Sequence, residues 1–289
     1  MSDAVTLEPG IRRLRAPNPS AMTFTGTNTY ILGTGRVAVV DPGPPDEAHL
    51  DAILAALAGE TIEAILVTHA HLDHSALAPA LSARTGTPVL AYGDAAAGRS
   101  PAMQALSGLA GGEGVDRAFR PDRCLADGEV VGGGTWSAVA LWTPGHFGNH
   151  LSFATGNAIL TGDVAMGWSS SLVSPPDGDL SAYLASCARL ARRGARILYP
   201  GHGDSVCDPA ERLAWLVAHR EERTRQILAA LRAGPSTARS LAERIYDDLS
   251  PALLPAAMRN VLAHLIDLTK KNRTEPLDPL GSDCRFQLV

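Results

Sequence analysis

Four side chains that commonly bind metals lie close together, directly after the apolar run 64–67: His69, His71, Asp73 and His74. Three imidazoles and a carboxylate suit zinc and, less selectively, manganese or iron. Residues two apart in an extended segment point the same way, so His69 and His71 can share one metal. Asp73 and His74 lie further along the turn and can serve a second metal. The cluster therefore predicts a dinuclear metal site.

Three further candidate ligands, His146, Asp163 and His202, each follow the end of a different predicted strand. Taken singly, each could instead be a hydrogen-bonded core residue. Loops at one end of a sheet can, however, converge on a single cleft. We therefore expect two ligand sets with Asp163 bridging between them, one made of His69, His71 and His146 and the other of Asp73, His74 and His202.

Two metals about 3.5–4 Å apart can share a water and lower its pKa toward about 7. The resulting hydroxide would attack an electrophilic carbonyl or phosphorus, while the metals stabilise the oxygen that gains charge. We expect Asp73 to orient this hydroxide, which makes Asp73 the candidate catalytic residue. Asp41, followed by Pro42 and Gly43, could by itself be a simple turn residue, but we expect it to be the hydrogen-bond partner of a ligating histidine. The expected cofactors are two Zn²⁺ per chain, with Mn²⁺ or Fe²⁺ as alternatives.

The composition is that of a soluble protein with a sizeable core, since 45% of the 289 residues are hydrophobic and 19% are charged. The net charge of −5 argues against a dedicated binder of polyanions. No apolar run is long enough to span a membrane, and residues 1–25 do not resemble a secretory signal. The four scattered cysteines fit a reducing compartment, so we expect a cytoplasmic protein.

Short β-rich runs alternate with helical patterns before about residue 205, which predicts an α/β architecture. The predicted strands include 37–40, 65–67, 138–142, 158–160 and 196–199, and the predicted helices include 46–58 and 75–84. Beyond residue 208 the pattern changes to three helices, at 211–233, 236–246 and 254–271, and a short strand at 284–289. Ser236 is the expected cap of the second helix. We therefore predict a catalytic domain at 1–208 and a small winged-helix-like domain at 209–289.

The ordered motifs resemble those of the metallo-β-lactamase superfamily. The H-x-H-x-D-H pattern at 69–74 is followed by His146, Asp163 and His202, and the resemblance covers residues 5–205. It implies a four-layer αββα sandwich, with zinc ligands at these positions and Asp163 as the bridge. The aspartate at 163 resembles the glyoxalase II side of the superfamily, whereas the commonest β-lactamases carry a cysteine there. The segment 26–32 and the C-terminal module resemble the β-lactamase-like protein 2 group, which includes an endoribonuclease and thioesterases.

The leading hypothesis is a dizinc hydrolase of small-molecule or carrier-bound esters or thioesters. The alternative is an endoribonuclease that cleaves single-stranded RNA. RNA is not favoured, because residues 1–204 hold 13 Lys/Arg against 19 Asp/Glu and no basic stripe with interleaved aromatics. Two further alternatives are an iron-dependent redox enzyme that uses the same ligands, and a transcriptional regulator in which the C-terminal module binds DNA.

The C-terminal helices are expected to have a structural role. We expect the third one to lie over the cleft or to support a homo-oligomer, rather than to read DNA, because its module is nearly neutral. The segment 167–176, with Trp168, is either a lining of the substrate entrance or an ordinary surface loop. His49, His219 and His264 are left without a role, and His150 is expected to support the site or the core.

Overall fold

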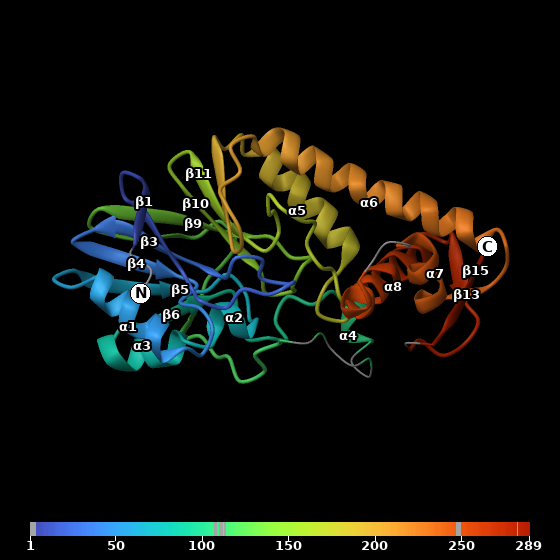
Figure 1. The fold of residues 1–289 in the computed structure, drawn as a ribbon, viewed down its shortest axis with the longest axis horizontal. Coiled ribbons are helices and arrows are strands. Elements are labelled where there is room, and N and C mark those ends of the chain that lie inside the picture. Colours follow the sequence, from blue (N-terminus) through green and yellow to red (C-terminus); the bar gives the residue numbers. More distant parts are fainter. Residues whose placement is uncertain (1–3, 107–108, 110–111, 113, 247–249, 282) are drawn as a thin grey trace.

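The computed structural model describes the chain apart from residues 1–3, 107–108, 110–111, 113, 247–249 and 282 (Figure 1). Two β-sheets lie face to face, and helices cover the outer face of each one. The C-terminal helices and a small third sheet lie at one end of this sandwich. Within the described residues, no helix has the length and hydrophobicity required to cross a lipid bilayer.

The first sheet has seven strands in sequential order, antiparallel from β1 to β4 and parallel from β4 to β7. Its strands are β1 Val5–Glu8, β2 Ile11–Arg15, β3 Asn28–Thr34, β4 Arg36–Val40, β5 Thr61–Leu66, β6 Val89–Ala91 and β7 Arg123–Cys124. The second sheet has the order β12-β11-β10-β9-β8, and only β11 and β12 pair in parallel. Its strands are β8 Val130–Gly133, β9 Trp136–Trp142, β10 Leu151–Thr155, β11 Ala158–Gly162 and β12 Ile197–Pro200.

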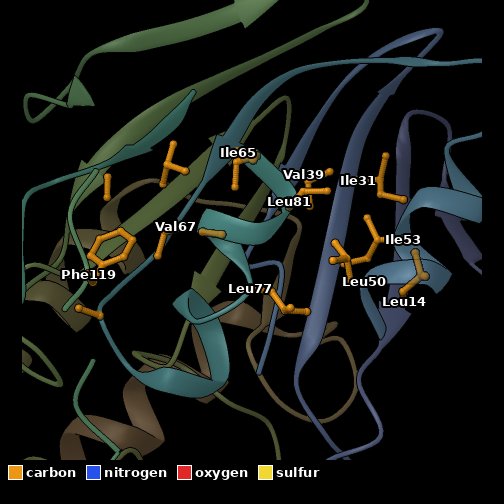
Figure 2. Close-up of a cluster of buried hydrophobic side chains, with 14 of the residues drawn as sticks. Leu14, Ile31, Val39, Leu50, Ile53, Ile65, Val67, Leu77, Leu81 and Phe119 are labelled. Atoms are coloured by element: carbon orange, nitrogen blue, oxygen red, sulfur yellow. The ribbon is translucent and has the colours of Figure 1, made fainter. Parts of the chain in front are cut away.

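The central strands of the first sheet are buried on both faces. In β4, Val37 and Val39 pack under the helices α1 (Glu47–Ala56) and α3 (Ala78–Thr85), in the core drawn in Figure 2. Their neighbours Ala38 and Val40 point the opposite way, into the core between the two sheets. This alternation follows from the two-residue period of a strand. It explains why the strand reads as a continuous apolar run.

A third core lies on the outer face of the second sheet. It is covered by α5 (Leu180–Arg192) and by the first half of α6 (Pro209–Leu231). Successive cores thus separate a helical layer, two sheets and a second helical layer. The predicted four-layer αββα sandwich is confirmed.

The C-terminal module has its own core, formed by α6, α7 (Ala238–Ile245), α8 (Leu254–Lys270) and a three-stranded sheet. The sheet order is β13-β15-β14, with β13 Ser236–Thr237, β14 Thr274–Pro276 and β15 Arg285–Leu288. This is the predicted winged-helix arrangement. Helix α6 contributes Leu213 and Leu216 to the third core of the sandwich and Ile227 and Leu231 to the C-terminal core. The domain boundary at 208/209 stays a prediction, because helix α6 packs into the cores of both the sandwich and the C-terminal module.

Two of the predicted helix boundaries are wrong. The helix expected at 75–84 is interrupted, because the backbone N–H of Leu77 donates to Gly43 O outside the helix. Two helices result, α2 (Leu72–Ser75) and α3. Ser236 is not the cap of α7, because it pairs with Phe286 in the small sheet, and Thr237 accepts the Ser240 N–H instead. The remaining short helices are α4 (Pro101–Gln104) and a 3₁₀ turn at Pro251–Leu253.

Candidate metal centre

The seven predicted ligands lie directly after strand ends at one edge of the sandwich, on loops and, for Asp73 and His74, on the short helix α2. Parallel neighbours end at the same edge, and this holds for β4 with β5 and for β11 with β12. The segments after β5, β9, β11 and β12 carry the ligands, and these side chains form two groups. The first group contains His69, His71, His146 and Asp163, and the second contains Asp73, His74 and His202. The three histidines of the first group and the three residues of the second are the predicted sets, and Asp163 lies with the first group.

In the first group, three ring nitrogens face one point. His71 Nδ1 lies 2.8 Å from His69 Nε2 and 3.2 Å from His146 Nε2. Asp163 Oδ2 lies 3.7 Å from His146 Nε2. A tetrahedral zinc with bonds of about 2.0–2.1 Å holds its ligand atoms roughly 3.3 Å apart. The donor types and their spacing therefore fit a zinc ion.

The second group has the same spacing. Asp73 Oδ2 lies 3.4 Å from His74 Nε2 and 3.2 Å from His202 Nε2, and the two imidazole nitrogens are 3.3 Å apart. Asp163 also reaches this group, with Oδ2 at 3.3 Å from His202 Nε2 and Oδ1 at 3.5 Å from His74 Nε2. Asp163 Oδ1 is buried and accepts no hydrogen bond from the described residues. A buried carboxylate oxygen without a donor is costly, and a cation is a suitable partner for it.

Hydrogen bonds on the far side of three rings fix which nitrogen faces the centre. In each ring Nδ1 is the donor. His69 Nδ1 donates to Thr68 Oγ1 at 2.9 Å, His74 Nδ1 to Asp41 Oδ2 at 2.9 Å, and His146 Nδ1 to Leu172 O at 2.6 Å. Because Nδ1 carries the proton in each case, Nε2 presents a lone pair in the neutral ring. Nε2 is also the atom that points into the group.

Asp41 supports two of these rings at once. It is buried, at 2% exposure, and it receives the Thr68 N–H at 2.7 Å and the Thr68 hydroxyl at 2.8 Å as well as the His74 ring. It therefore acts on His74 directly and on His69 through Thr68. The structure places Asp41 where a partner of a ligating histidine was expected. Thr68 was not predicted, since a threonine at a strand end carries no chemical signal of its own.

The two groups differ in protonation before any metal binds. Burial lowers the pKa of His69 and His146, and it lowers that of His71 to about 3, so these rings are neutral. Burial would also lower the pKa of His202, but Asp163 and Asp73 raise it to about 9. The second group thus holds protons, whereas the first already offers free lone pairs.

The carboxylates and histidines of the second group and Asp163 also shift one another's pKa values. Burial opposes the protonation of His74, yet Asp73, Asp163 and Asp41 raise its pKa well above its ordinary value. Burial would raise the pKa of Asp163, but His202 and His74 hold it well below its usual range. The second group is therefore a set of charge-paired residues when no metal is present.

The other histidines lie outside the two groups. His150 is fully buried; its Nε2 accepts the Asp163 N–H at 3.2 Å and its Nδ1 bonds Thr143 Oγ1 at 3.0 Å. It holds the backbone of Asp163 from behind, as expected for a supporting residue. The remaining three bond or stack elsewhere: His49 with Thr29, His264 with Thr224 and His219 with Trp215.

A cavity of about 350 Å³ opens onto the two ligand groups and is lined in part by His71 and Asp73, their two half-buried members. One wall comes from the C-terminal module, through Leu253, Ala256 and Arg259. The expectation that the third C-terminal helix covers the cleft is thus met. These wall residues were not predicted, because the sequence of a helix does not say which loop it packs against.

A second hollow of about 230 Å³ shares His146, Asp163, Leu253 and Ala256 with the first. Of the two interpretations offered for the segment 167–176, the structure favours a lining of the site, because Trp168, Ser169, Ser170 and Leu172 line this hollow. The Trp168 ring stacks on Phe24, with ring centroids 4.8 Å apart. Two hollows therefore meet at the candidate metal centre.

Comparison with known families identifies both parts of the chain. The metallo-beta-lactamase superfamily matches residues 22–202. The beta-lactamase associated winged helix domain matches residues 237–278.

Individual relatives extend over most of the chain. A beta-lactamase-like protein 2 homolog from Drosophila melanogaster is 30% identical over 93% of this chain and 91% of its own length. An atrochrysone carboxyl ACP thioesterase from Aspergillus fumigatus is 30% identical over 78% of this chain, which spans 66% of that relative's length. The crystal structure of a metallo-beta-lactamase family protein from Thermus thermophilus aligns with a TM-score of 0.78 and 26% identity, covering 98% of this chain and 100% of that one.

Proposed function

We propose that this hydrolase, which belongs to the metallo-beta-lactamase superfamily, cleaves ester or thioester bonds of acyl substrates at a dinuclear zinc centre. The observation that carries the proposal is the convergence of two ligand groups on one cavity, with Asp163 lying against both. Zinc is favoured by the imidazole and carboxylate donors, and manganese and iron accept the same set. Two zinc ions bound here would supply a hydroxide at neutral pH and polarise the substrate carbonyl.

Asp73 is suited to orient the attacking water. Its Oδ2 is held by the Thr27 hydroxyl at 3.3 Å and by His202 at 3.2 Å, and its side chain, 27% exposed, lines the cavity. The carboxylate is therefore fixed in place and still reaches the solvent-accessible space. We assign Asp73 the role of orienting the attacking hydroxide toward the substrate carbonyl. Asp163, buried behind it, keeps the two ligand groups together.

The shape of the cavity favours acyl substrates. The two hollows meet at His146 and Asp163, so both sides of a scissile bond have room. The shared wall is apolar, formed by Met22, Leu172 and Leu253 among others. A relative is named as a thioesterase of an acyl carrier protein, which supports a carrier-bound acyl group as the substrate class.

The charges argue against RNA as the substrate. Among the described residues that line the two hollows, Arg259 is the only lysine or arginine. In the basic run at 189–196, Arg189 pairs with Asp127 at 2.8 Å and Arg196 pairs with Glu8. A track of free cations is what a polyanion needs for binding.

The test is a substrate panel on the zinc-loaded protein: p-nitrophenyl esters, acyl thioesters of N-acetylcysteamine and single-stranded RNA. We expect turnover of the esters or thioesters, and loss of about 10²-fold or more in Asp73→Asn. The exposed Asp51→Asn on α1 is the matched control and should keep full activity. Cleavage of RNA alone would contradict the proposal.

Metal analysis tests the centre itself. Protein purified without added metal should contain about two zinc ions per chain, and Asp163→Ala should lose much of this content. A single iron per chain in the native protein would instead indicate redox chemistry.

A further inference from the structure

We infer that Asn260 and Arg220 of the C-terminal module are positioning residues for the metal ligand His146. They act through the loop Ser171–Val173, which they hold from the opposite side. The inference rests on the proposed metal site and adds a function for the C-terminal module, which would set the orientation of a ligand as well as forming a wall of the cavity.

The loop Ser171–Val173 lies between His146 and the C-terminal module and bonds to both. His146 Nδ1 donates to Leu172 O at 2.6 Å, so the position of this carbonyl sets the rotation of the ring. The ring is 6% exposed and Leu172 is its hydrogen-bond acceptor on the side away from the ligand group. Displacement of the carbonyl would turn Nε2 away from His71 Nδ1, which lies 3.2 Å from it.

Residues on each side of Leu172 are tied to the C-terminal helices. The Val173 N–H donates to Asn260 Oδ1 on α8 at 3.0 Å. Arg220 on α6 donates from Nη2 to Ser171 O and from Nη1 to the same Asn260 Oδ1 at 3.1 Å. One guanidinium thus joins the loop and the amide that holds it.

Arg220 is an unusual residue to use for packing alone. It is 1% exposed, and within the described part of the chain no carboxylate pairs with it. Its positive charge is met by two neutral oxygens and by the ring of Tyr183, 5.4 Å from the guanidinium carbon. A buried cation without a counter-ion carries a desolvation cost that an apolar side chain would avoid. Its planar fork, however, reaches two acceptors at once, which an apolar side chain cannot do.

The experiment measures zinc affinity in a His202→Ala background, which leaves the His69, His71 and His146 group as the intact half. Zinc is titrated in competition with a chromophoric chelator. Partners that orient a ligating histidine typically contribute 10–100-fold in metal affinity. We expect Asn260→Leu to lower the affinity about 10-fold, and Asn260→Asp, which keeps an oxygen for Val173 and Arg220, to stay within about twofold.

Two further variants separate positioning from general packing. Arg220→Lys keeps the buried charge but loses the fork, so we expect a loss similar to that of Asn260→Leu. Asp267→Asn is the matched control, because Asp267 lies on α8 at 3% exposure and bonds Ser181 of α5 without touching the loop. It should leave the zinc affinity unchanged.

A second readout uses the metal-free protein. Nitrogen-15 NMR of the His146 ring should show the Nδ1–H tautomer in the wild type and a mixture of tautomers in Asn260→Leu. The inference is overturned if Asn260→Leu keeps wild-type affinity and tautomer, or if Asp267→Asn loses as much affinity. Failure of the proposed function is a different result, since the parent protein would then bind no zinc at this group.

Discussion

Replacing Asp41 by asparagine tests whether a residue that touches no metal controls the metal centre. The carboxylate serves three donors: Oδ1 receives the Thr68 N–H at 2.7 Å, and Oδ2 receives the Thr68 hydroxyl at 2.8 Å and His74 Nδ1 at 2.9 Å. An asparagine has one oxygen and one NH₂ group, so it cannot accept at both positions.

Either orientation of the amide has a specific cost. With its oxygen toward His74, the NH₂ group faces the buried Thr68 N–H and leaves that donor unpaired, which costs about 1–3 kcal/mol of folding stability. With its oxygen toward the Thr68 N–H, the NH₂ group faces His74 Nδ1. The His74 ring must then move its proton to Nε2, the atom that faces the second ligand group. We expect a loss of 10–100-fold in zinc affinity in that case, or about 1.4–2.7 kcal/mol.

The assay combines zinc competition titration with urea unfolding of the metal-free protein. Asp116→Asn is the matched control, because Asp116 is a buried aspartate at 8% exposure that bonds Ser75 and no ring of the centre. It should cost stability without changing zinc affinity. If Asp41→Asn keeps both the wild-type zinc affinity and the wild-type urea midpoint, the reasoning about the shared carboxylate is refuted.

Four other outcomes follow from the site. Zinc loading at pH 7 should release protons from His74 and His202, because their pKa values are raised (that of His202 to about 9) and ligation needs neutral rings. Calorimetry in two buffers of different ionisation enthalpy measures the number of protons released. In the metal-free protein the raised pKa of His202 contributes stability that is complete below about pH 6.5 and is lost as the pH rises through about 9, so the urea midpoint should fall over that interval. Trp168→Ala should raise KM about 2–10-fold through lost ring contact, with zinc content unchanged; an unaltered KM would remove Trp168 from the binding site. Ala256→Trp should fill the junction of the two hollows and lower kcat/KM at least about 10-fold, again at full zinc content.

Much of the centre could be predicted because its chemistry is local in sequence. A single histidine or aspartate at a strand end is ambiguous, but the cluster at 69–74 together with three more such residues at separate strand ends can be recognised as a set, and parallel strands then bring their ends to one edge. The strand β4 was equally clear, since burial on both faces makes Val37–Val40 a continuous apolar run. These features depend on residue type and on the period of a strand alone.

Other features depend on contacts between distant segments, and no local pattern reports them. Thr68 gains its role only because Asp41 lies beside it. Helix α8 is apolar like any packed helix, and nothing in its sequence says that Ala256 and Arg259 face the cavity. The break before α3 similarly arises from a hydrogen bond between Leu77 and Gly43.

The placement of α6 bears on how the chain unfolds. This helix of 23 residues, about 35 Å long, inserts Leu216 into one core and Ile227 into another. Melting either core would remove half of the helix's packing, and a helix gains most of its stability from such packing. The sandwich and the C-terminal module should therefore denature in one cooperative transition, although they match two separate families. A proteolytic cut after residue 208 would not release two self-sufficient pieces, since the third core would lose the leucines that cover it.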